Sequence, residues 1–321
     1  MEAIIQAATR AVVADPALPH RFDIRVVEGP SPLAHEALVA VKAFSLNGGE
    51  VRNAMAATTV LRPGWDLGGV VERAAADGSG PPEGTRVAGV LWPSGAWAER
   101  VAISTRAIAP VPDGVSLAQA SALPVAGLTA FYGLSKAGLL LGKSVLVTGA
   151  SGSVGRFVCR LATLSGARVT ALLRSDAAEA ELRAEGVQDI VVGDHAVLEQ
   201  RQARYGLVFE TQGGASLARS LTRLDRGGLC VVCGNASNQR TTFEARAFYH
   251  QGRVSLAGLY LDSEMEQRPA AEGLAILLDL VRDQRLQPPI EVEASWREIA
   301  PIAARFSRRE IRGKAVLHVG D

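Results

Sequence analysis

Short apolar runs alternate with glycine- and proline-rich segments in the N-terminal part of the chain. Many apolar residues in these runs are β-branched, and the separating segments hold pairs such as Gly-Gly, Gly-Pro and Pro-Pro. Such alternation predicts short strands joined by turns, and therefore a β-rich domain. The expected strands cover residues 3–8, 22–28, 36–45, 68–75, 85–91 and 97–104.

The hydrophobic period changes near Leu117. A helical pattern interrupted at Pro124 leads into an apolar strand at 144–148, a glycine-rich turn and an amphipathic helix that ends at Gly166. Further apolar runs, separated by helical or polar sequence, complete six candidate strands and predict a doubly wound parallel sheet. These further strands are expected at residues 167–173, 189–193, 206–211, 227–234 and 253–260.

The C-terminal part returns to mixed sequence. Residues 270–286 have a helical pattern that stops before Pro288, and a last apolar strand starts at Lys314. We therefore expect an α/β protein with two domains. Residues 1–116 and 266–321 form the β-rich domain, and residues 117–265 form the domain with the parallel sheet.

The composition favours a globular protein with a small-molecule ligand. The chain has 321 residues, 48% of them hydrophobic and 21% charged, so it can bury a large core. Its 34 basic and 33 acidic side chains give a net charge of +1, which offers no attraction for nucleic acid or an anionic membrane. No apolar stretch reaches the roughly 20 residues that span a membrane.

The three cysteines and the N-terminal residues indicate a reducing, cytoplasmic location. Three cysteines cannot form a disulfide framework, and MEAIIQAATR lacks the basic flank and unbroken apolar stretch of a signal peptide. Cys230 and Cys233 form a CxxC motif, but alternation along a strand places them on opposite faces, and a second pair is missing. We interpret them as buried small apolar residues.

The turn after the strand at 144–148 has the pattern of a dinucleotide fingerprint. In VLVTGASGSVG, glycines at 149, 152 and 155 lie between a buried strand and an amphipathic helix. Gly152 lets the backbone approach a pyrophosphate, and amides at the helix start donate to the anion. An ordinary tight turn is the alternative. The cofactor-binding candidates here are Gly149, Ser151, Gly152, Ser153 and Val154.

The end of the second strand of the sheet favours NADPH over NADH. A dinucleotide fold places an acid there for the ribose hydroxyls, or a basic group for a 2′-phosphate. This chain has Arg174 and Ser175 at that point. A guanidinium forms paired, charge-assisted contacts with a phosphate, and a hydroxyl adds a donor. Asp176 follows and keeps NADH as the alternative, although an acid at this position also suits a helix cap.

Seven stretches occur in order over nearly the whole chain: FDIRVVEGPSP with EALVAVKAFSLN, PGWDLGGVVE, GAWAERVAI, ALPVAGLTAFYGL, VLVTGASGSVG, GGLCVVCGNAS and GKAVLHV. In these stretches the chain resembles the zinc-independent branch of the medium-chain dehydrogenase/reductases, the quinone oxidoreductase and enoyl reductase group. The resemblance implies a GroES-like β-rich catalytic domain, a Rossmann domain and a homodimer that pairs the edge strand SLAGLYL.

The positions that hold zinc in the metal-dependent relatives carry other residues here. Those relatives use an early Cys and the His of a Gly-His-Glu motif, whereas this chain reads Ser45-Leu46-Asn47 and Gly64-Trp65-Asp66. A structural zinc lobe needs four closely spaced cysteines, and only three are present. We predict that no metal is bound.

The resemblance implies hydride transfer from NADPH, without a metal, to a quinone or to the C=C bond of an α,β-unsaturated carbonyl. Such a reaction needs a hydrogen bond to the developing oxyanion and a proton for carbon. Asn47 is the candidate for orienting the cofactor ribose or the substrate oxygen, with a turn at Asn47-Gly48-Gly49 as the alternative. Tyr260 is the candidate proton donor, with a core or interface aromatic as the alternative.

The resemblance also suggests further cofactor contacts. Thr129 would bind the ribose or pyrophosphate, or alternatively its own helix. Cys233, Gly234 and Asn235 follow the fifth strand and would hold the carboxamide. Lys314 would reach the cofactor phosphates, or alternatively lie on the surface before the last strand.

Other functions remain open at this point. A short-chain reductase of the extended type tolerates the glycine spacing, but it needs a Rossmann strand at the start of the chain, and none is found there. An enoyl-thioester reductase of a biosynthetic pathway and a non-catalytic NADPH-binding sensor or structural protein are the remaining alternatives.

Overall fold

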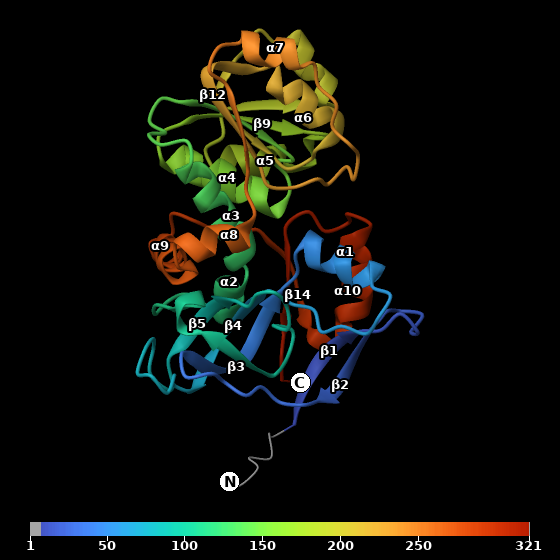
Figure 1. Ribbon diagram of the computed structural model, residues 1–321, viewed down its shortest axis with the longest axis vertical. Helices are drawn as coiled ribbons and strands as arrows, with labels where there is room; N and C mark the ends of the chain where they lie inside the picture. The colour runs from blue at the N-terminus through green and yellow to red at the C-terminus, as the bar shows by residue number, and fades with distance from the viewer. Residues whose placement is uncertain (1–7, 321) are drawn as a thin grey trace. The chain divides into compact units, whose positions relative to one another are not determined.

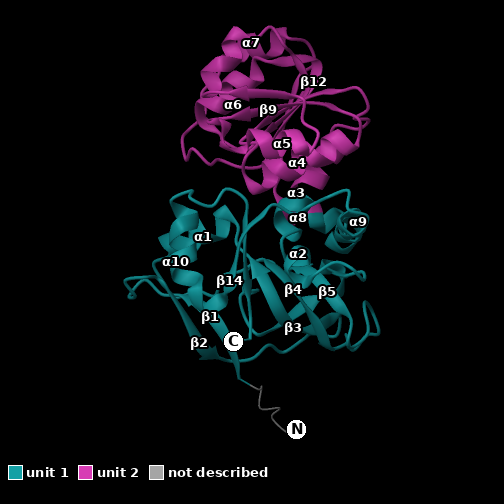
Figure 2. Ribbon diagram, turned by 180° about the vertical axis from the view of Figure 1, so that it is seen from behind, with its two compact units in different colours: residues 1–128, 265–321 teal, residues 129–264 magenta. Residues whose placement is uncertain are grey.

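The computed structural model describes residues 8–320, which fall into two compact units. Unit 1 comprises residues 1–128 and 265–321, and unit 2 comprises residues 129–264 (Figure 2). The hydrophobic patterns change at residue 117 and return at residue 266. The domain bounds drawn from those patterns stay predictions.

Unit 2 is built on one parallel sheet with the strand order β10-β9-β8-β11-β12-β13. This confirms the predicted doubly wound sheet. The strands are β8 (Ser144–Thr148), β9 (Arg168–Leu173), β10 (Asp189–Val192), β11 (Tyr205–Glu210), β12 (Leu224–Val232) and β13 (Ser255–Gly258). The helices and turns are α4 (Ser153–Leu164), η2 (Asp176–Ala178), α5 (Glu179–Ala184), η3 (His195–Gln200), α6 (Gly214–Leu221) and α7 (Ala245–His250).

The order of the strands places a topological switch point between β8 and β11. The chain runs outward from β8 through β9 to β10, then returns to the other side of β8 with β11. Ligands of such sheets bind outside the carboxyl ends of the strands at this point. Val145, Leu146 and Val147 are fully buried, as expected for a central parallel strand covered on both faces.

Unit 1 contains a seven-stranded sheet and a separate two-stranded sheet. In the large sheet the order is β14-β15-β3-β4-β5-β7, and β6 pairs with β3. The small sheet pairs β1 with β2. The strands are β1 (Thr9–Ala14), β2 (Phe22–Val27), β3 (Glu36–Ser45), β4 (Asp66–Arg73), β5 (Arg86–Val90), β6 (Arg100–Ser104), β7 (Ile108–Pro110), β14 (Ile290–Ser295) and β15 (Lys314–His318).

Distant parts of the chain meet in the core of unit 1. Antiparallel pairing of β15 with β3 joins the C-terminal part to the N-terminal part. Helices α1 and α10 pack together beside this sheet (Figure 1), and the core between them holds the fully buried Phe44, Trp97 and Trp296. The helices of unit 1 are α1 (Gly48–Ala56), α2 (Leu117–Ser121), α9 (Ala270–Arg282) and α10 (Ile299–Ser307), with short turns η1 (Thr105–Ala107) and η4 (Trp296–Glu298).

Two helices, α3 and α8, each begin in one unit and end in the other. The helical pattern around Pro124 resolves into α2 and α3 (Pro124–Ser135), with the proline at the first helical position, where its missing N–H costs nothing. At the other crossing, α8 (Leu261–Gln267) begins in unit 2 and ends in unit 1.

Three strands differ from the expectations. The strand β14 was not predicted, although its sequence IEVEAS alternates, because the prolines before it suggested a connection. The short β7 was also missed. Most of the first expected run, residues 3–7, lies outside the described residues, and β1 begins at Thr9. Within residues 8–320, no helix combines the length and the apolar character needed to cross a membrane.

Candidate functional site

The glycine-rich turn lies at the carboxyl end of β8 and leads into α4. Gly149 has a φ of +60°, and a Cβ there would lie 2.2 Å from Nε2 of Gln212. A Cβ on Gly155 would lie 2.3 Å from the carbonyl oxygen of Gly149. Both distances are far below van der Waals contact. The turn therefore requires glycine at both positions, one for its backbone conformation and one for close packing of α4.

The middle glycine faces open space. Gly152 is the N-cap of α4, and a Cβ there would meet only the carbonyl oxygen of Gly149, at 3.4 Å. Having no side chain, Gly152 supplies no capping oxygen to the first turn of α4. The first amides of a helix lack partners within the helix and attract anions. The turn thus fits the pyrophosphate of a dinucleotide.

Arg174 and Ser175 follow β9, the strand that neighbours β8. Both are exposed, and Arg174 makes no ion pair or side-chain hydrogen bond within residues 8–320. Asp176 is also exposed and opens the short helix η2, with Ser175 as its N-cap residue. An arginine without an internal partner, next to a pyrophosphate cradle, is available for a further phosphate.

A buried carboxylate that the sequence analysis did not predict bridges the switch point. Glu210 ends β11 and has no exposed surface. Its Oε1 accepts hydrogen bonds from Thr148 Oγ1 at 2.8 Å and Ser216 Oγ at 2.7 Å, and its Oε2 accepts from the amides of Gln212 and Gly213. These bonds tie the end of β8 to the start of α6. An acidic residue near the end of the apolar run GLVFET was a signal in the sequence that could have indicated this carboxylate.

The segment after β12 lies at the same edge of the sheet. A Cβ on Gly234 would lie 2.9 Å from the carbonyl oxygen of Thr211, so the two strand ends approach closely there. Asn235 is exposed, and its Nδ2 donates to the carbonyl oxygen of Gln239. Burial, assisted by the charge of Glu210, raises the pKa of the Cys233 thiol to about 12. Burial also raises the pKa of Cys230. Neither thiol is therefore a reactive thiolate at neutral pH. Cys230 is buried in β12 as expected, but Cys233 follows the strand and is half-buried, so the prediction of two buried strand residues is wrong for Cys233.

In unit 1 the stretches that correspond to the zinc ligands of relatives form a buried polar cluster. We define this cluster as Ser45, Asn47, Glu50, Asp66 and Lys314. Asp66 Oδ2 accepts from Ser45 Oγ at 2.7 Å, Asn47 Nδ2 at 2.7 Å and Lys314 Nζ at 2.8 Å. The side chains of Asp66 and Lys314 have no exposed surface. The cluster is thus a fully desolvated ion pair with polar neighbours.

The position of Lys314 contradicts the expectation that it reaches the cofactor phosphates. Its ammonium group donates to Asn47 Oδ1 at 2.7 Å and to Asp66 Oδ2, inside the core of unit 1. A buried lysine needs a counter-charge, and Asp66 provides it. Asp66 is the first residue of β4 and Lys314 is the first residue of β15. Residues so far apart in the chain gave no reason to pair them.

Glu50 is the second acid of the cluster. Its Oε1 accepts from the backbone amide and from Nδ2 of Asn47. Its Oε2 is buried and has no partner within the described residues. Burial, and then the nearby charge of Asp66, raise the pKa of Glu50 well above its ordinary value near 4.5. A neutral Glu50 leaves one positive and one negative charge in the cluster, so the buried charges balance.

Replacing Glu50 with glutamine should therefore change the pH dependence of stability. Because the folded pKa of Glu50 is raised, the folded state binds more protons, and stability is lost as pH rises from about 4.5 toward the folded pKa. Glutamine matches the neutral acid in shape and has no such loss. In urea unfolding at a series of pH values, we expect the free energy of unfolding of E50Q to increase relative to that of the wild type as pH rises.

The control for this series is the exposed Glu310. Hydrogen bonding to Arg308 lowers its pKa, so its contribution is present at neutral pH and lost as pH falls. E310Q should change the pH profile in the opposite direction. A difference between E50Q and the wild type that does not vary with pH would mean that Glu50 is ionised in the folded protein.

Two further candidates differ in burial. Thr129 lies in α3 and is 6% exposed. Tyr260 follows β13 and is 60% exposed, so it is not a core aromatic. Among the candidate residues, Asn47 and Lys314 lie together in unit 1. The residues of the glycine turn, Arg174 and residues 233–235 all follow the carboxyl ends of strands in the parallel sheet of unit 2.

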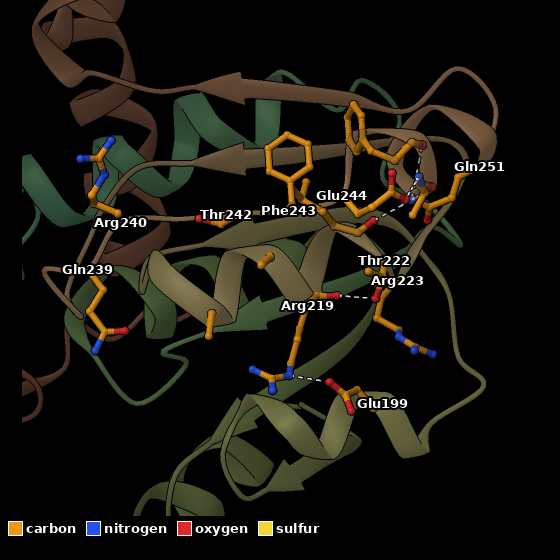
Figure 3. Close-up of a pocket in the computed structure, with 15 residues that line it drawn as sticks. Glu199, Arg219, Thr222, Arg223, Gln239, Arg240, Thr242, Phe243, Glu244 and Gln251 are labelled. Carbon is orange, nitrogen blue, oxygen red and sulfur yellow. Dashed lines mark hydrogen bonds and ion pairs between the residues drawn. The ribbon is translucent and has the colours of Figure 1, made fainter.

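A pocket of about 670 Å³ lies elsewhere in unit 2 (Figure 3). It is lined by α6, α7 and the segment before α7, and Arg219 forms an ion pair with Glu199 at its edge. Phe243 and Phe248 pack edge to face there. The lining includes none of the cofactor candidates, so this pocket is not the dinucleotide site.

Among residues 8–320, no group of three or more His, Cys, Asp or Glu is arranged to hold a metal ion. The metal-free mechanism stays a prediction.

Comparisons with curated proteins and with solved structures both give matches to oxidoreductases. No family model matches the chain. A spectinabilin polyketide synthase system protein, NorB, of Streptomyces orinoci is 34% identical over 299 residues, which are 90% of this chain and 13% of that protein. A chloroplast envelope quinone oxidoreductase homolog of Arabidopsis thaliana is 28% identical over 82% of this chain and 83% of its own length.

A solved structure agrees with the fold described above. An alcohol dehydrogenase superfamily protein from Novosphingobium aromaticivorans superposes with a TM-score of 0.84 at 25% identity, covering 98% of this chain and 100% of that one.

Proposed function

Because this chain belongs to the quinone oxidoreductase and enoyl reductase group of the medium-chain dehydrogenase/reductases, we propose that it is an NADPH-dependent reductase. Its acceptor is a quinone or the C=C bond of an α,β-unsaturated carbonyl. The observation that carries this proposal is the unpaired Arg174 beside the glycine turn at the end of the parallel sheet. Bound NADPH would supply the hydride, without a metal.

The residues of unit 2 divide the work of holding the cofactor. Amides at the start of α4, with Gly152 leaving the approach open, would bind the pyrophosphate. The guanidinium of Arg174 and the hydroxyl of Ser175 would bind the 2′-phosphate. Glu210 holds the neighbouring strand ends together through four hydrogen bonds. The site is therefore shaped before the ligand arrives, which lowers the entropy cost of binding.

An enoyl thioester is the second candidate acceptor, and one comparison favours it. The polyketide synthase protein matches this chain over 90% of its length. The chain spans only 13% of that protein, so the activity of the whole relative is not transferred.

We also propose a cytoplasmic homodimer in which β13 pairs with its copy. The strand ends the sheet and its Leu256 is 42% exposed, as an edge that pairs with another chain requires.

The activity is tested by mixing purified protein with NADPH and panels of quinones, enones and enoyl thioesters, and following the loss of nicotinamide absorbance. Turnover of either of the first two panels supports the proposal. Turnover of thioesters alone favours the second candidate. NADPH binding without turnover of any acceptor would favour a sensor.

Replacing Arg174 with aspartate should reverse the cofactor preference. A charge-assisted hydrogen bond is lost and a like-charge repulsion is added, so we expect the Kd for NADPH to rise about 10- to 100-fold while that for NADH stays nearly constant. Isothermal calorimetry measures both. The matched control is Arg168→Asp, which makes the same charge change at the opposite end of β9, where Arg168 is exposed. An unchanged ratio of the two Kd values in R174D would reject the phosphate-binding role.

A further inference from the structure

The pocket of unit 2 drawn in Figure 3 is lined by one face of each of two helices. The face of α6 carries Ala215, Ala218, Arg219 and Thr222, and the face of α7 carries Glu244, Ala247, Phe248 and Gln251. Both sets follow the spacing i, i+3, i+4, i+7, which places residues on the same side of a helix. Gln251 Nε2 donates to the carbonyl oxygen of Leu221 at 3.0 Å, so the two helices are joined at their C-terminal ends.

Alanine residues on these two faces leave room for a ligand. Ala215 and Ala218 lie on α6, and Ala247 lies on α7. Longer side chains at these positions would extend into the pocket. Its volume of about 670 Å³ lies within the roughly 300–1,000 Å³ that small-molecule sites occupy. The pocket therefore has the size of a binding site for a small organic molecule.

Two phenylalanines give the pocket an aromatic wall. The ring centroids of Phe243 and Phe248 are 5.6 Å apart, and the ring planes make an angle of 62°. The side chain of Phe243 is 41% exposed, although it is large and apolar. A ligand that covered this ring would remove apolar surface from water, which is favourable. The aromatic wall thus favours a ligand with an apolar body.

The charged residues of the lining leave one positive charge in excess, since three are arginines and two are glutamates. Both carboxylates already have partners. Glu199 Oε1 accepts from Arg219 Nε at 2.6 Å. The two oxygens of Glu244 accept from the first amides of α7, at 2.8 and 2.5 Å. The pocket therefore presents no free carboxylate that would repel an anion.

The other two arginines have no acidic partner within residues 8–320. Arg223 donates to the carbonyl oxygen of Arg201 at 2.7 Å, and its Nε is buried without a partner among those residues. Arg240 is exposed and makes no ion pair or side-chain hydrogen bond with them. Hydrogen bonds from a guanidinium to a carboxylate or phosphate are about twice as strong as neutral ones. These arginines favour a ligand with an anionic group.

We propose that this pocket binds a small organic anion, in which a carboxylate or phosphate is joined to an aromatic or alkyl body. The body lies against Phe243 and the alanines, and the anionic group reaches Arg223 or Arg240. The site is distinct from the glycine turn, Arg174 and residues 233–235, because none of them lines it. The inference goes beyond the proposed reductase function and does not depend on it.

The first test compares anionic probes with a neutral one. Calorimetry measures the Kd of 2-naphthoate, 2-naphthyl phosphate, decanoate and the neutral 2-naphthamide with the full chain. We expect the Kd of 2-naphthoate to be about tenfold lower than that of 2-naphthamide, the value of a hydrogen bond to a charged group. The phosphate and decanoate then identify the preferred anionic group and body. Equal Kd values for the naphthoate and the amide, or no binding of any probe, would overturn the proposal.

The second test fills the pocket. Ala247→Leu puts a larger side chain on the pocket face of α7 and should raise the Kd of the tightest-binding probe at least tenfold. The matched control is Ala245→Leu, the same substitution at an exposed position of α7 that does not line the pocket. A245L should keep the Kd of the wild type. If A247L keeps it too, the probe binds elsewhere and the proposal is wrong.

The third test removes positive charge. Arg223→Gln keeps a donor for the carbonyl oxygen of Arg201, and Arg240→Gln changes an exposed side chain, so both variants should fold with the thermal midpoint of the wild type. We expect at least one of them to raise the Kd of 2-naphthoate about tenfold. The control Arg246→Gln removes the same charge from an exposed position outside the lining. Unchanged Kd values in both R223Q and R240Q would contradict the proposal.

Competition with NADPH separates the pocket from the dinucleotide site. The Kd of 2-naphthoate is measured again with NADPH present at saturation, and we expect it to stay within about twofold. Displacement of the probe by NADPH would place it at the dinucleotide site and overturn the inference. If NADPH itself neither binds nor is oxidised with any acceptor, only the proposed function fails, and the probe measurements still decide the present inference.

Discussion

Replacing Lys314 alone with methionine should lower the free energy of unfolding by about 3–5 kcal/mol. The variant keeps the volume of the side chain but leaves the carboxylate of Asp66 buried without its counter-charge, since both groups have no exposed surface. Removing one partner of a buried pair is costly for this reason, whereas removing both is not. Urea unfolding followed by tryptophan fluorescence at pH 7 measures the change.

Two controls separate this effect from loss of packing. The paired variant D66N–K314Q should recover most of the lost stability, because no buried charge remains and an amide oxygen at position 66 can still accept from Ser45, Asn47 or the Val125 amide. The exposed Lys42→Met should stay within about 0.5 kcal/mol of the wild type. A paired variant as unstable as K314M would show that the shape of these side chains, and not their charge, holds unit 1 together.

Replacing Gly155 with alanine should weaken NADPH binding about 100-fold. The new Cβ would lie 2.3 Å from the carbonyl oxygen of Gly149 and 2.7 Å from Cα of Ala150, so the start of α4 must move away from the turn. A shift of about 1 Å in a preorganised site costs binding and rate on this scale. Calorimetry with NADPH measures the effect, and circular dichroism checks that the parallel sheet remains.

The matched control is Gly258→Ala in β13. A Cβ at that position has no heavy atom within 4 Å, so the same substitution meets no obstacle. G258A should bind NADPH as the wild type does. Wild-type affinity in G155A would mean that the turn does not hold the pyrophosphate.

The parallel sheet was predictable because its signals are local. One buried strand, three glycines and an amphipathic helix occur in sequence within residues 144–166, and each supports the interpretation of the others. The same holds for β3, whose predicted bounds at residues 36–45 match the structure. The strand β14 was missed because two prolines precede a short alternating run. Local pattern alone does not show that such a run finds a partner in β15.

The buried clusters could not be predicted in the same way. Asp66 and Lys314 are separated by 248 positions. From the sequence, Asp66 indicated only a missing zinc ligand, and Lys314 suggested a phosphate ligand or a surface lysine. The meaning of Lys314 changes completely once its partner is known, from a phosphate ligand to a structural cation. Glu210 was overlooked for a related reason, since its four donors come from β8, α6 and the turn before α6.

The pairing of Asp66 with Lys314 delays completion of unit 1 while the protein is synthesised. Asp66 leaves the ribosome 248 residues before its partner does, and β15, which pairs with β3, emerges with that partner. Unit 2 lies between them as one continuous segment and can form first. Until Lys314 is synthesised, the carboxylate of Asp66 has no counter-charge, and the edge of β3 that pairs with β15 stays unpaired. An unpaired strand edge of this kind is prone to pairing with other chains.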